Sequence, residues 1–317
     1  MASPDNPAAG VQIAVIVPCR NEAASIAKVV ADFRATLPDA TVFVYDNDSD
    51  DATSKIAAGA GAVVRSEILP GKGNVVRRMF SDIDADVYLM SDGDGTYDPK
   101  IAPDLIRMIT VDALDMVVGV RLPDEAEGVF RPGHRAGNKT LTKFVGWLFG
   151  HRFSDILSGY RAFSRRFVKS FPALATGFEI ETELTIHALE LKMPVGEVSA
   201  TYAARPKGSH SKLSTWRHGF RIFATIIFLF KEVRPARFFG SIFILLALVS
   251  LLMTYPLIIT YLQTGLVPRL PTVVLATGIM LLAFISAVCG IILDTVSRGR
   301  RESKRMIYLS MPGPGQS

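Results

Sequence analysis

The chain has 317 residues, a formal net charge of +5 at pH 7 and 49% hydrophobic residues. Its positive mean hydropathy excludes an ordinary, wholly soluble protein, and its 21% of charged residues exclude a wholly intramembrane one. The length suits one large domain with an added segment. The positive charge fits an anionic partner, but it does not distinguish nucleic acid from a membrane surface or a phosphorylated substrate.

The N-terminal residues 1–10 are polar and lack a basic stretch followed by an apolar one, so we expect a disordered start and no signal peptide. From residue 11 onward, apolar runs alternate with helical stretches. Strands are expected at 13–18, 41–46, 62–65, 87–91 and 115–121, and helices at 23–36, 52–60, 73–83 and 99–111. This alternation predicts an α/β fold, a Rossmann-like and mostly parallel sheet with helices on both faces.

Charged residues gather where these strands end. The segments are VPCRNE at 17–22, YDNDSDDAT at 45–53, SDGDGTYDP at 91–99 and VVGVR at 117–121. Ligands of parallel sheets bind beyond the carboxyl ends of the strands, which share one edge. Carboxylates brought together there repel unless a cation joins them, and oxygen ligands suit Mg²⁺ or Mn²⁺. The pattern indicates a divalent ion carrying a nucleotide diphosphate; taken alone, each acidic turn has a second interpretation, a solvated loop or a helix cap.

Two other motifs are excluded. Counted from Asp92 or from Asp46, the sixth position is Tyr97 or Asp51, where a calcium-binding loop needs glycine. The GKG at 71–73 has no Ser or Thr after its lysine, so it is not a P-loop. The only cysteines, Cys19 and Cys289, lie in different contexts, which does not suit a disulfide framework and fits a reducing compartment.

Composition changes near residue 235. No charged residue lies between Arg237 and Arg269, and residues 270–293 are again uncharged. Both stretches exceed the roughly 20 residues that a helix needs to cross the hydrocarbon core. We therefore predict that the segment 236–297 holds two transmembrane helices, with bounds near 238–262 and 270–296.

Basic residues flank both predicted spans on the same side of the membrane: Lys231, Arg234, Arg237, Arg298, Arg300, Arg301, Lys304 and Arg305. The positive-inside rule therefore places both termini, the domain at 11–212 and the basic tail at 298–317 in the cytoplasm. The region 213–235 mixes basic and apolar residues. It has two interpretations, an amphipathic juxtamembrane helix in the interface and a helix that caps the soluble domain.

Taken in order, VPCRNE, DNDSDDAT, the DGD at 92–94 and VVGVR resemble the motifs of family-2 glycosyltransferases, which have the GT-A fold. RPGHRAGNK at 131–139, DILSGYRAF at 155–163, GFEIETEL at 177–184 and ARPKGSHSKL at 204–213 narrow the resemblance to the polyprenyl-phosphate glycosyltransferases, the dolichyl-phosphate mannose synthase group. The resemblance covers residues 11–235, and two C-terminal spans suit its bacterial members.

The resemblance, with the loops at the strand ends, implies roles for individual residues. The expected nucleotide-sugar contacts are Pro18, Asn21, Glu22, Asp46, Asn47, Lys72 and Asp92. The expected catalytic residues are Asp92, Asp94, Arg121 and Asp155, and the expected metal ligands are Asp94, Asp92 and Thr96. The expected contacts of a lipid phosphate are Arg121, Arg131, Arg135, Arg205, Ser211 and Lys212.

Two positions depart from the pattern of the resembling family. Relatives usually have a second aspartate at the position of Asn47, which leaves the base of the nucleotide open. Many relatives have glutamine at the position of Thr96, so water or Asp98 is an alternative for completing the metal shell.

The implied activity is a metal-dependent, inverting transfer of a sugar from a UDP- or GDP-sugar to undecaprenyl or dolichyl phosphate. The enzyme would be a multi-pass protein of the cytoplasmic (inner) membrane, with the bilayer but no nucleic acid as a partner, and self-association stays open. Two alternatives are a processive polysaccharide synthase, which normally carries a Gln-x-x-Arg-Trp signature and more spans, and a non-catalytic membrane scaffold that binds a sugar nucleotide. The sequence names neither the sugar, the base, the prenyl chain length nor the pathway.

Overall fold

The computed structural model describes residues 10–123, 140, 142–147, 150, 153–177, 179–202, 224, 227–228 and 230–314. The chain divides into two compact units. The first holds residues 1–222 and 304–317, and the second holds residues 223–303.

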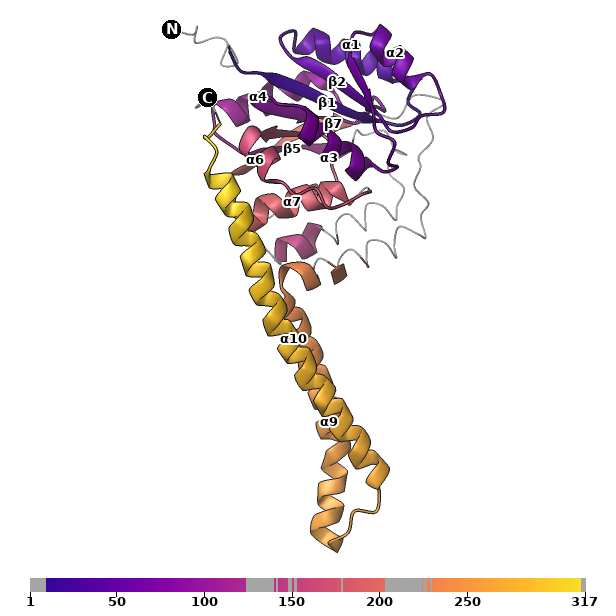
Figure 1. Cartoon of the computed structure of the whole chain (residues 1–317), viewed down its shortest axis with the longest axis vertical. Helices are drawn as coiled ribbons and strands as arrows, with labels where there is room; N and C mark the ends of the chain where they lie inside the picture. Colours follow the sequence, from indigo (N-terminus) through magenta and orange to yellow (C-terminus); the bar gives the residue numbers. More distant parts are fainter. Residues whose placement is uncertain are drawn as a thin grey trace. The chain divides into compact units, whose positions relative to one another are not determined.

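The first unit alternates strands and helices in the predicted order (Figure 1). Every strand and helix expected between residues 13 and 121 is present, with bounds that differ by up to three residues. The elements are β1 Ile13–Cys19, α1 Ile26–Thr36, β2 Thr41–Asp46, α2 Thr53–Gly59, β3 Val63–Ser66, α3 Lys72–Asp82, β4 Val87–Met90, η1 Pro99–Ile101, α4 Ala102–Thr110, β5 Met116–Pro123, β6 Arg161–Ser164, α6 Arg165–Ser170, α7 Ile180–Leu191 and β7 Val195–Tyr202.

The strands form one sheet in the order β3-β2-β1-β4-β6-β5-β7. Strands β1 to β4 pair in parallel, β5 and β7 are parallel to each other, and β6 runs antiparallel to both of its neighbours. The predicted mostly parallel sheet is confirmed. The chain order reverses at β1, which lies between β2 and β4. The carboxyl ends of β1 and β4 therefore form a topological switch point, where ligands bind in such sheets.

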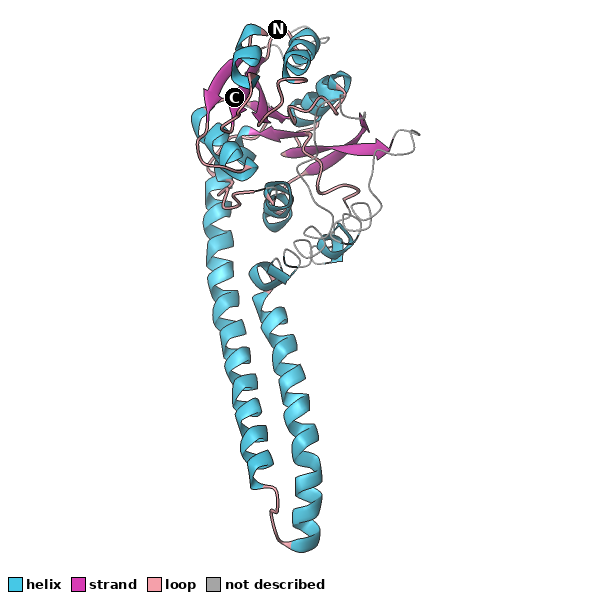
Figure 2. Cartoon of the chain, turned by 90° about the vertical axis from the view of Figure 1, so that its right-hand side faces the viewer, coloured by secondary structure: helices cyan, strands magenta, loops and turns pink. Residues whose placement is uncertain are grey.

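Helices cover both faces of this sheet (Figure 2). On one face, Val15 and Val17 of β1 join an apolar cluster with Val30 of α1 and Leu105 of α4. Helices α3, α6 and α7 lie on the other side of the sheet (Figure 1). Strand β1 is buried along its whole length, as the continuous apolar run of its sequence predicts for a strand that is covered on both faces.

The second unit contains two long helices, α9 Pro235–Thr264 and α10 Leu270–Leu309, of which α10 ends in the first unit. Both are long and apolar enough to cross a membrane, and only 11% and 17% of their most apolar windows are buried. The core helix of a soluble protein would be mostly buried. This exposure of apolar side chains therefore favours lipid as the surrounding medium.

Small residues let the two helices approach each other. The buried residues of α10 are Ala276, Ala283, Gly290 and Ser297, which recur at heptad spacing. A Cβ atom added at Gly290 would lie 2.9 Å from the Cβ of Phe239. Close approach through small residues is the usual basis of helix packing in membranes, where apolar burial between helices provides little driving force.

The C-terminal segment, residues 304–314, packs on the sheet domain of the first unit. The Tyr308 hydroxyl donates a hydrogen bond of 2.7 Å to Oδ2 of the fully buried Asp115. Arg166 donates to both oxygens of the same carboxylate, at 2.6 and 2.8 Å, and its guanidinium lies 4.6 Å from the centroid of the Tyr308 ring. Because a buried carboxylate needs both charge compensation and donors, Tyr308 and Arg166 together stabilise Asp115.

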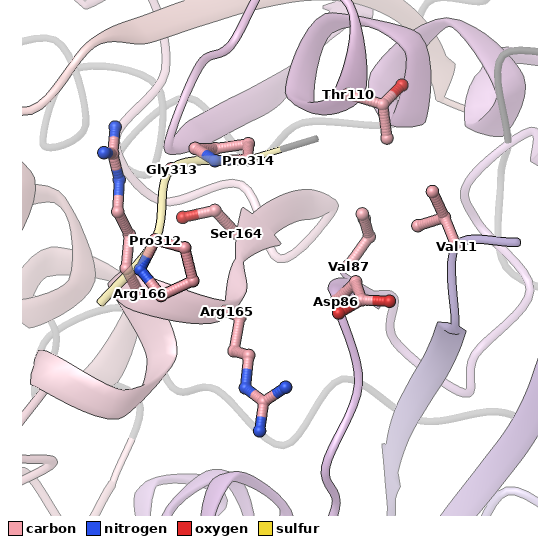
Figure 3. A pocket seen from close by; sticks show the side chains of 10 residues that line it. All are labelled: Val11, Asp86, Val87, Thr110, Ser164, Arg165, Arg166, Pro312, Gly313 and Pro314. Carbon is pink, nitrogen blue, oxygen red and sulfur yellow. The ribbon is translucent and has the colours of Figure 1, made fainter. Parts of the chain in front are cut away.

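A small pocket beside this contact is lined partly by Pro312, Gly313 and Pro314 of the C-terminal segment (Figure 3). It is also lined by Val11, which precedes β1, and by Val87, which begins β4. The pocket therefore lies at the amino-terminal edge of the sheet, away from the switch point at the carboxyl ends.

We expect Tyr308→Phe to lower the unfolding free energy of the full chain by about 1–2 kcal/mol, because Asp115 loses one donor but keeps Arg166 and Ser164. Denaturant unfolding in detergent, followed by protease sensitivity of the sheet domain, measures this loss. The matched control is Tyr261→Phe, since Tyr261 is 54% exposed on α9. Equal stability of the two variants would show that the Tyr308 hydroxyl does not stabilise Asp115.

Candidate active site

The DGD motif follows β4 at the switch point. Asp94 is 4% exposed, and its Oδ1 accepts hydrogen bonds from the backbone N–H of Thr96 at 3.2 Å and from the Thr96 hydroxyl at 2.6 Å. A Cβ atom at Gly93 would lie 2.4 Å from Sγ of Cys19, so glycine is needed for the motif to pack against the end of β1. Thr96 thus fixes the orientation of Asp94, while Asp98 accepts from the Lys100 N–H and caps η1.

The GKG at 71–73 places Lys72 beside this motif. Gly71 has φ +120°, a backbone conformation that other residues rarely adopt. Cβ atoms added at Gly71 and Gly73 would lie 2.2 and 2.1 Å from the carbonyl oxygens of Thr176 and Ala175. The two glycines therefore let the start of α3 lie directly on the segment before α7.

Lys72 bridges two carboxylates from distant parts of the chain. Its Nζ lies 2.5 Å from Oδ1 of Asp92 and 2.6 Å from Oε1 of Glu181, which belongs to the first turn of α7. Burial opposes the charged form of Lys72, but the carboxylates of Asp92 and Glu181 outweigh it and raise the pKa of Lys72 above its ordinary value. Lys72 therefore carries a positive charge beside the DGD motif.

The loop after β2 is organised by Asp46 and Asn47. Asp46 accepts from the hydroxyl groups of Ser49 and Ser54. The Asn47 side chain donates to the carbonyls of Glu67 and Leu69, at 2.8 and 2.7 Å, and accepts from the Gly71 N–H at 2.7 Å. A carboxylate cannot donate, so an aspartate at position 47 would lose both bonds to these carbonyls. Asn47 thereby holds the loop that ends in the GKG.

The loops after β1 and β2 are joined. Asn21 has φ +51° and exchanges hydrogen bonds with the second loop, through its N–H to Ser49 and its Oδ1 from the Asp50 N–H. The Glu22 N–H donates to the Thr53 hydroxyl at 2.9 Å. Pro18, another expected nucleotide contact, lies within β1 and is buried. These bonds place the loops after the two strands next to each other at the carboxyl edge of the sheet.

Arg121 and Asp155 form a two-pronged ion pair. Nε and Nη2 of Arg121 donate to the two carboxylate oxygens of Asp155 at 2.6 and 2.8 Å, and the side chains are 17% and 6% exposed. Oδ1 of Asp155 also accepts from the Leu157 N–H at 3.1 Å. The Asp155 hydrogen bond contributes to raising the pKa of Arg121 against the effect of burial. Both residues were expected at the site, and the structure brings them together.

Arg161 was not predicted as a site residue. It is fully buried in DILSGYRAF and donates to the Ser158 and Ile156 carbonyls and to the Thr185 hydroxyl. Burial lowers the pKa of Arg161 to about 10, with the charges of Glu181 and Asp155 opposing that shift. The four-residue strand that Arg161 begins, RAFS, carries no clear apolar pattern in the sequence that could have identified it. Through these three hydrogen bonds, Arg161 holds the loop that carries Asp155 against α7.

DILSGYRAF also touches the DGD motif through Gly159. A Cβ atom at Gly159 would lie 2.6 Å from Oδ2 of Asp92, and the Gly159 N–H donates to the Tyr97 hydroxyl at 2.9 Å.

The five expected lipid-phosphate contacts other than Arg121 lie outside the described residues: Arg131, Arg135, Arg205, Ser211 and Lys212.

The donor set fits a divalent cation that also binds a ligand. Within the ranges that the structure describes, no group of three or more His, Cys, Asp and Glu side chains can hold a metal ion alone. Asp92 and Asp94 supply two carboxylates, and Mg²⁺ commonly takes one or two carboxylates and completes its shell with phosphate oxygens and water. With Lys72 beside them, these residues are able to receive a diphosphate together with its ion.

Several known proteins are similar to this chain in sequence. The profile described as Glycosyl transferase family 2 matches residues 14–170. Glycosyltransferase AglJ of Haloferax volcanii is 36% identical over 231 residues, covering 73% of this chain and 76% of that protein. An undecaprenyl-phosphate mannosyltransferase of Micrococcus luteus is 25% identical over 224 residues, covering 64% and 88%.

The fold is also shared with a solved structure, that of glucosyl-3-phosphoglycerate synthase from Mycobacterium tuberculosis in complex with Mn²⁺ and UDP-glucose. It has a TM-score of 0.57 and 23% identity, and the match covers 72% of this chain and 81% of that one. This likeness confirms the predicted GT-A fold. The profile match and the identity to AglJ show that the chain belongs to glycosyl transferase family 2.

Proposed function

We propose that this protein transfers a sugar from a UDP- or GDP-sugar to a polyprenyl phosphate, undecaprenyl or dolichyl phosphate, with inversion and with Mg²⁺ or Mn²⁺. The observation that carries this proposal is the Lys72–Asp92–Asp94 arrangement at the switch point of a family-2 chain that also has two helices able to cross a membrane. A diphosphate site and a membrane anchor in one chain fit a water-soluble donor and a lipid acceptor.

On the donor side, Asp92 and Asp94 would hold the ion and Lys72 would contact the diphosphate. The ion, when bound, stabilises the charge that develops on the leaving nucleoside diphosphate. Lys72 adds a fixed positive charge in a buried setting, where electrostatic stabilisation is stronger than in water. The loops of Asn21, Glu22 and Asp46 would enclose the nucleoside.

On the acceptor side, binding of a phosphate monoester requires positively charged side chains, and its activation as a nucleophile does not require a general base. Its second pKa is near 6, so at neutral pH the nucleophilic oxygen is already an anion. Arg121 lies at this edge, and Arg131, Arg135, Arg205, Ser211 and Lys212 are proposed to complete the phosphate site. The spans would keep the domain at the cytoplasmic face of the membrane, following the positive-inside rule.

The named relatives support the lipid acceptor and the donor. The Micrococcus luteus relative is named for transfer to undecaprenyl phosphate, and the structural relative was crystallised with Mn²⁺ and UDP-glucose. Two helices able to cross a membrane add support for an acceptor that resides in the bilayer.

We expect membranes that contain the protein to move label from one of a panel of UDP- and GDP-sugars into the organic phase, in a form released by mild acid. The Asp94→Asn variant at equal expression is the control. Label in a water-soluble polymer would instead indicate a processive synthase. Tight nucleotide binding without any transfer across the whole panel would indicate a scaffold and contradict the proposal.

A further inference from the structure

Glu181 belongs to GFEIETEL and has no part in the function proposed so far. It lies in the first turn of α7, is 5% exposed, and pairs with Lys72 through Oε1. Among the described residues, its Oε2 is buried and has no hydrogen-bond partner. A buried carboxylate with an unmet oxygen lowers stability unless charge compensates it. Lys72 compensates Glu181 by direct contact, and the buried Arg161 interacts with it electrostatically.

We propose that Glu181 is a positioning residue. It keeps the Lys72 ammonium shared between two carboxylates and thereby sets how strongly Asp92 and Asp94 attract a divalent cation. This inference rests on the proposed function in one respect, because it takes Asp92 and Asp94 as the cation-binding pair.

Charge counting gives the reason. Lys72 contacts Asp92 and Glu181 at nearly equal distances, 2.5 and 2.6 Å. If a neutral side chain replaced Glu181, the Lys72 ammonium would contact Asp92 alone and would oppose the entry of a cation more strongly. With the Glu181 carboxylate in place, the Lys72 ammonium is shared between two carboxylates. The DGD motif then keeps more negative potential, while Lys72 stays beside it for the diphosphate. Such effects are large where side chains are shielded from water.

Backbone hydrogen bonds hold Lys72 and Glu181 in the positions that let Lys72 contact both carboxylates. Helix α7 carries both Glu181 and Glu183, and Glu183 accepts from the N–H groups of Leu174 and Ala175 at 3.0 and 2.7 Å. The GKG at 71–73 lies against the same segment: the Gly73 N–H donates a hydrogen bond of 3.1 Å to the Thr176 carbonyl. One helix therefore fixes the segment on which Lys72 rests and supplies the carboxylate that Lys72 contacts.

The test uses two isosteric or near-isosteric changes with opposite expected signs. Glu181→Gln should weaken Mn²⁺ binding on the order of tenfold, since it removes a negative charge and commits Lys72 to Asp92. Lys72→Met should strengthen Mn²⁺ binding several-fold while weakening UDP or GDP binding on the order of tenfold. A purely structural role would weaken both ligands in both variants.

Free Mn²⁺ is measured by electron paramagnetic resonance during titration of the purified full chain in detergent, without nucleotide and again with UDP and with GDP. Glu183→Gln is the matched control on the same helix. It should lower the melting temperature without shifting Mn²⁺ affinity, because its bonds are to backbone N–H groups. Glu181→Asp, which keeps the charge, should restore most of the affinity lost in Glu181→Gln.

If Glu181→Gln does not fold, the double variant Lys72→Met with Glu181→Gln replaces it. Removal of both charges should leave Mn²⁺ affinity at or above the wild-type value. Unchanged affinity in Glu181→Gln, or a shift in the same direction in Glu181→Gln and Lys72→Met, would overturn the positioning role. Failure of the proposed function looks different: Asp94→Asn would then bind Mn²⁺ as the wild type does, or no lipid would be labelled.

Discussion

Replacing Asp94 by Asn or Ala is expected to abolish sugar transfer, with kcat/KM lowered by at least about a thousandfold, or roughly 4 kcal/mol of transition-state stabilisation. Asp94 is nearly buried at the end of β4, and Thr96 holds its carboxylate in one orientation through two hydrogen bonds. Loss of its charge removes one of only two carboxylates proposed to hold the ion. Asp92→Ala should cause nearly as large a loss and should also leave Lys72 without one of its two partners.

The matched control for Asp94→Asn is Asp98→Asn, in the same loop. Asp98 caps η1 through the Lys100 N–H, so its loss should change transfer only a few-fold. A loss as large as that of Asp94→Asn would instead identify Asp98 as the residue that completes the metal shell. EDTA should reproduce the loss seen for Asp94, and added Mn²⁺ or Mg²⁺ should restore transfer. Initial rates at several donor concentrations separate kcat from KM. Full activity in excess EDTA would contradict the proposal that transfer requires a divalent cation at Asp92 and Asp94.

Much of this site could be predicted because it depends on strand ends. The apolar run before Asp92 predicts a buried strand, and parallel strands bring their carboxyl ends to one edge. Asp92, Asp94, Asn21 and Asp46, which lie at or just after strand ends, are therefore expected at that edge. A local apolar pattern is sufficient for such a prediction.

Contacts between distant segments could not be predicted in the same way. Lys72 and Glu181 are far apart in the sequence, and their contact depends on how the segment before α7 lies on the GKG. The four-residue strand β6 begins with the buried Arg161, which gives it little of an apolar strand pattern. The contact of Tyr308 could not be predicted either. A basic, polar C-terminal tail is normally expected to lie in solvent, and its hydrogen bond to Asp115 is visible only in the structure.

Breaking the Arg121–Asp155 pair is the change expected to affect stability most. The pair is bidentate and largely buried, at 17% and 6% exposure, so removing one partner deprives the other buried charge of the two hydrogen bonds within the pair. We expect Asp155→Ala and Arg121→Met each to lower the unfolding free energy of the sheet domain by about 3 kcal/mol. Denaturant unfolding of the full chain, with ligands absent, measures both losses.

The double variant, Arg121→Met with Asp155→Leu, should recover most of that loss, because replacing both charges by apolar groups leaves no uncompensated charge. Asp155→Leu alone completes the cycle. Additive losses would mean that the two side chains do not stabilise each other in solution, contrary to the geometry of the pair.

The same residues decide how the acceptor is activated. If the nucleophile is a phosphate anion, transfer should fall below about pH 6 as the phosphate takes up a proton, and no carboxylate is required as a base. Asp155, whose oxygens accept from Arg121 and Leu157, then acts by holding Arg121 at the edge of the sheet. Asp155→Asn should therefore raise the KM for the lipid more than it lowers kcat, and its pH profile should keep the acidic limb. A loss of several orders of magnitude in kcat with both substrates saturating, together with disappearance of that limb, would identify Asp155 as a general base and refute activation by charge alone.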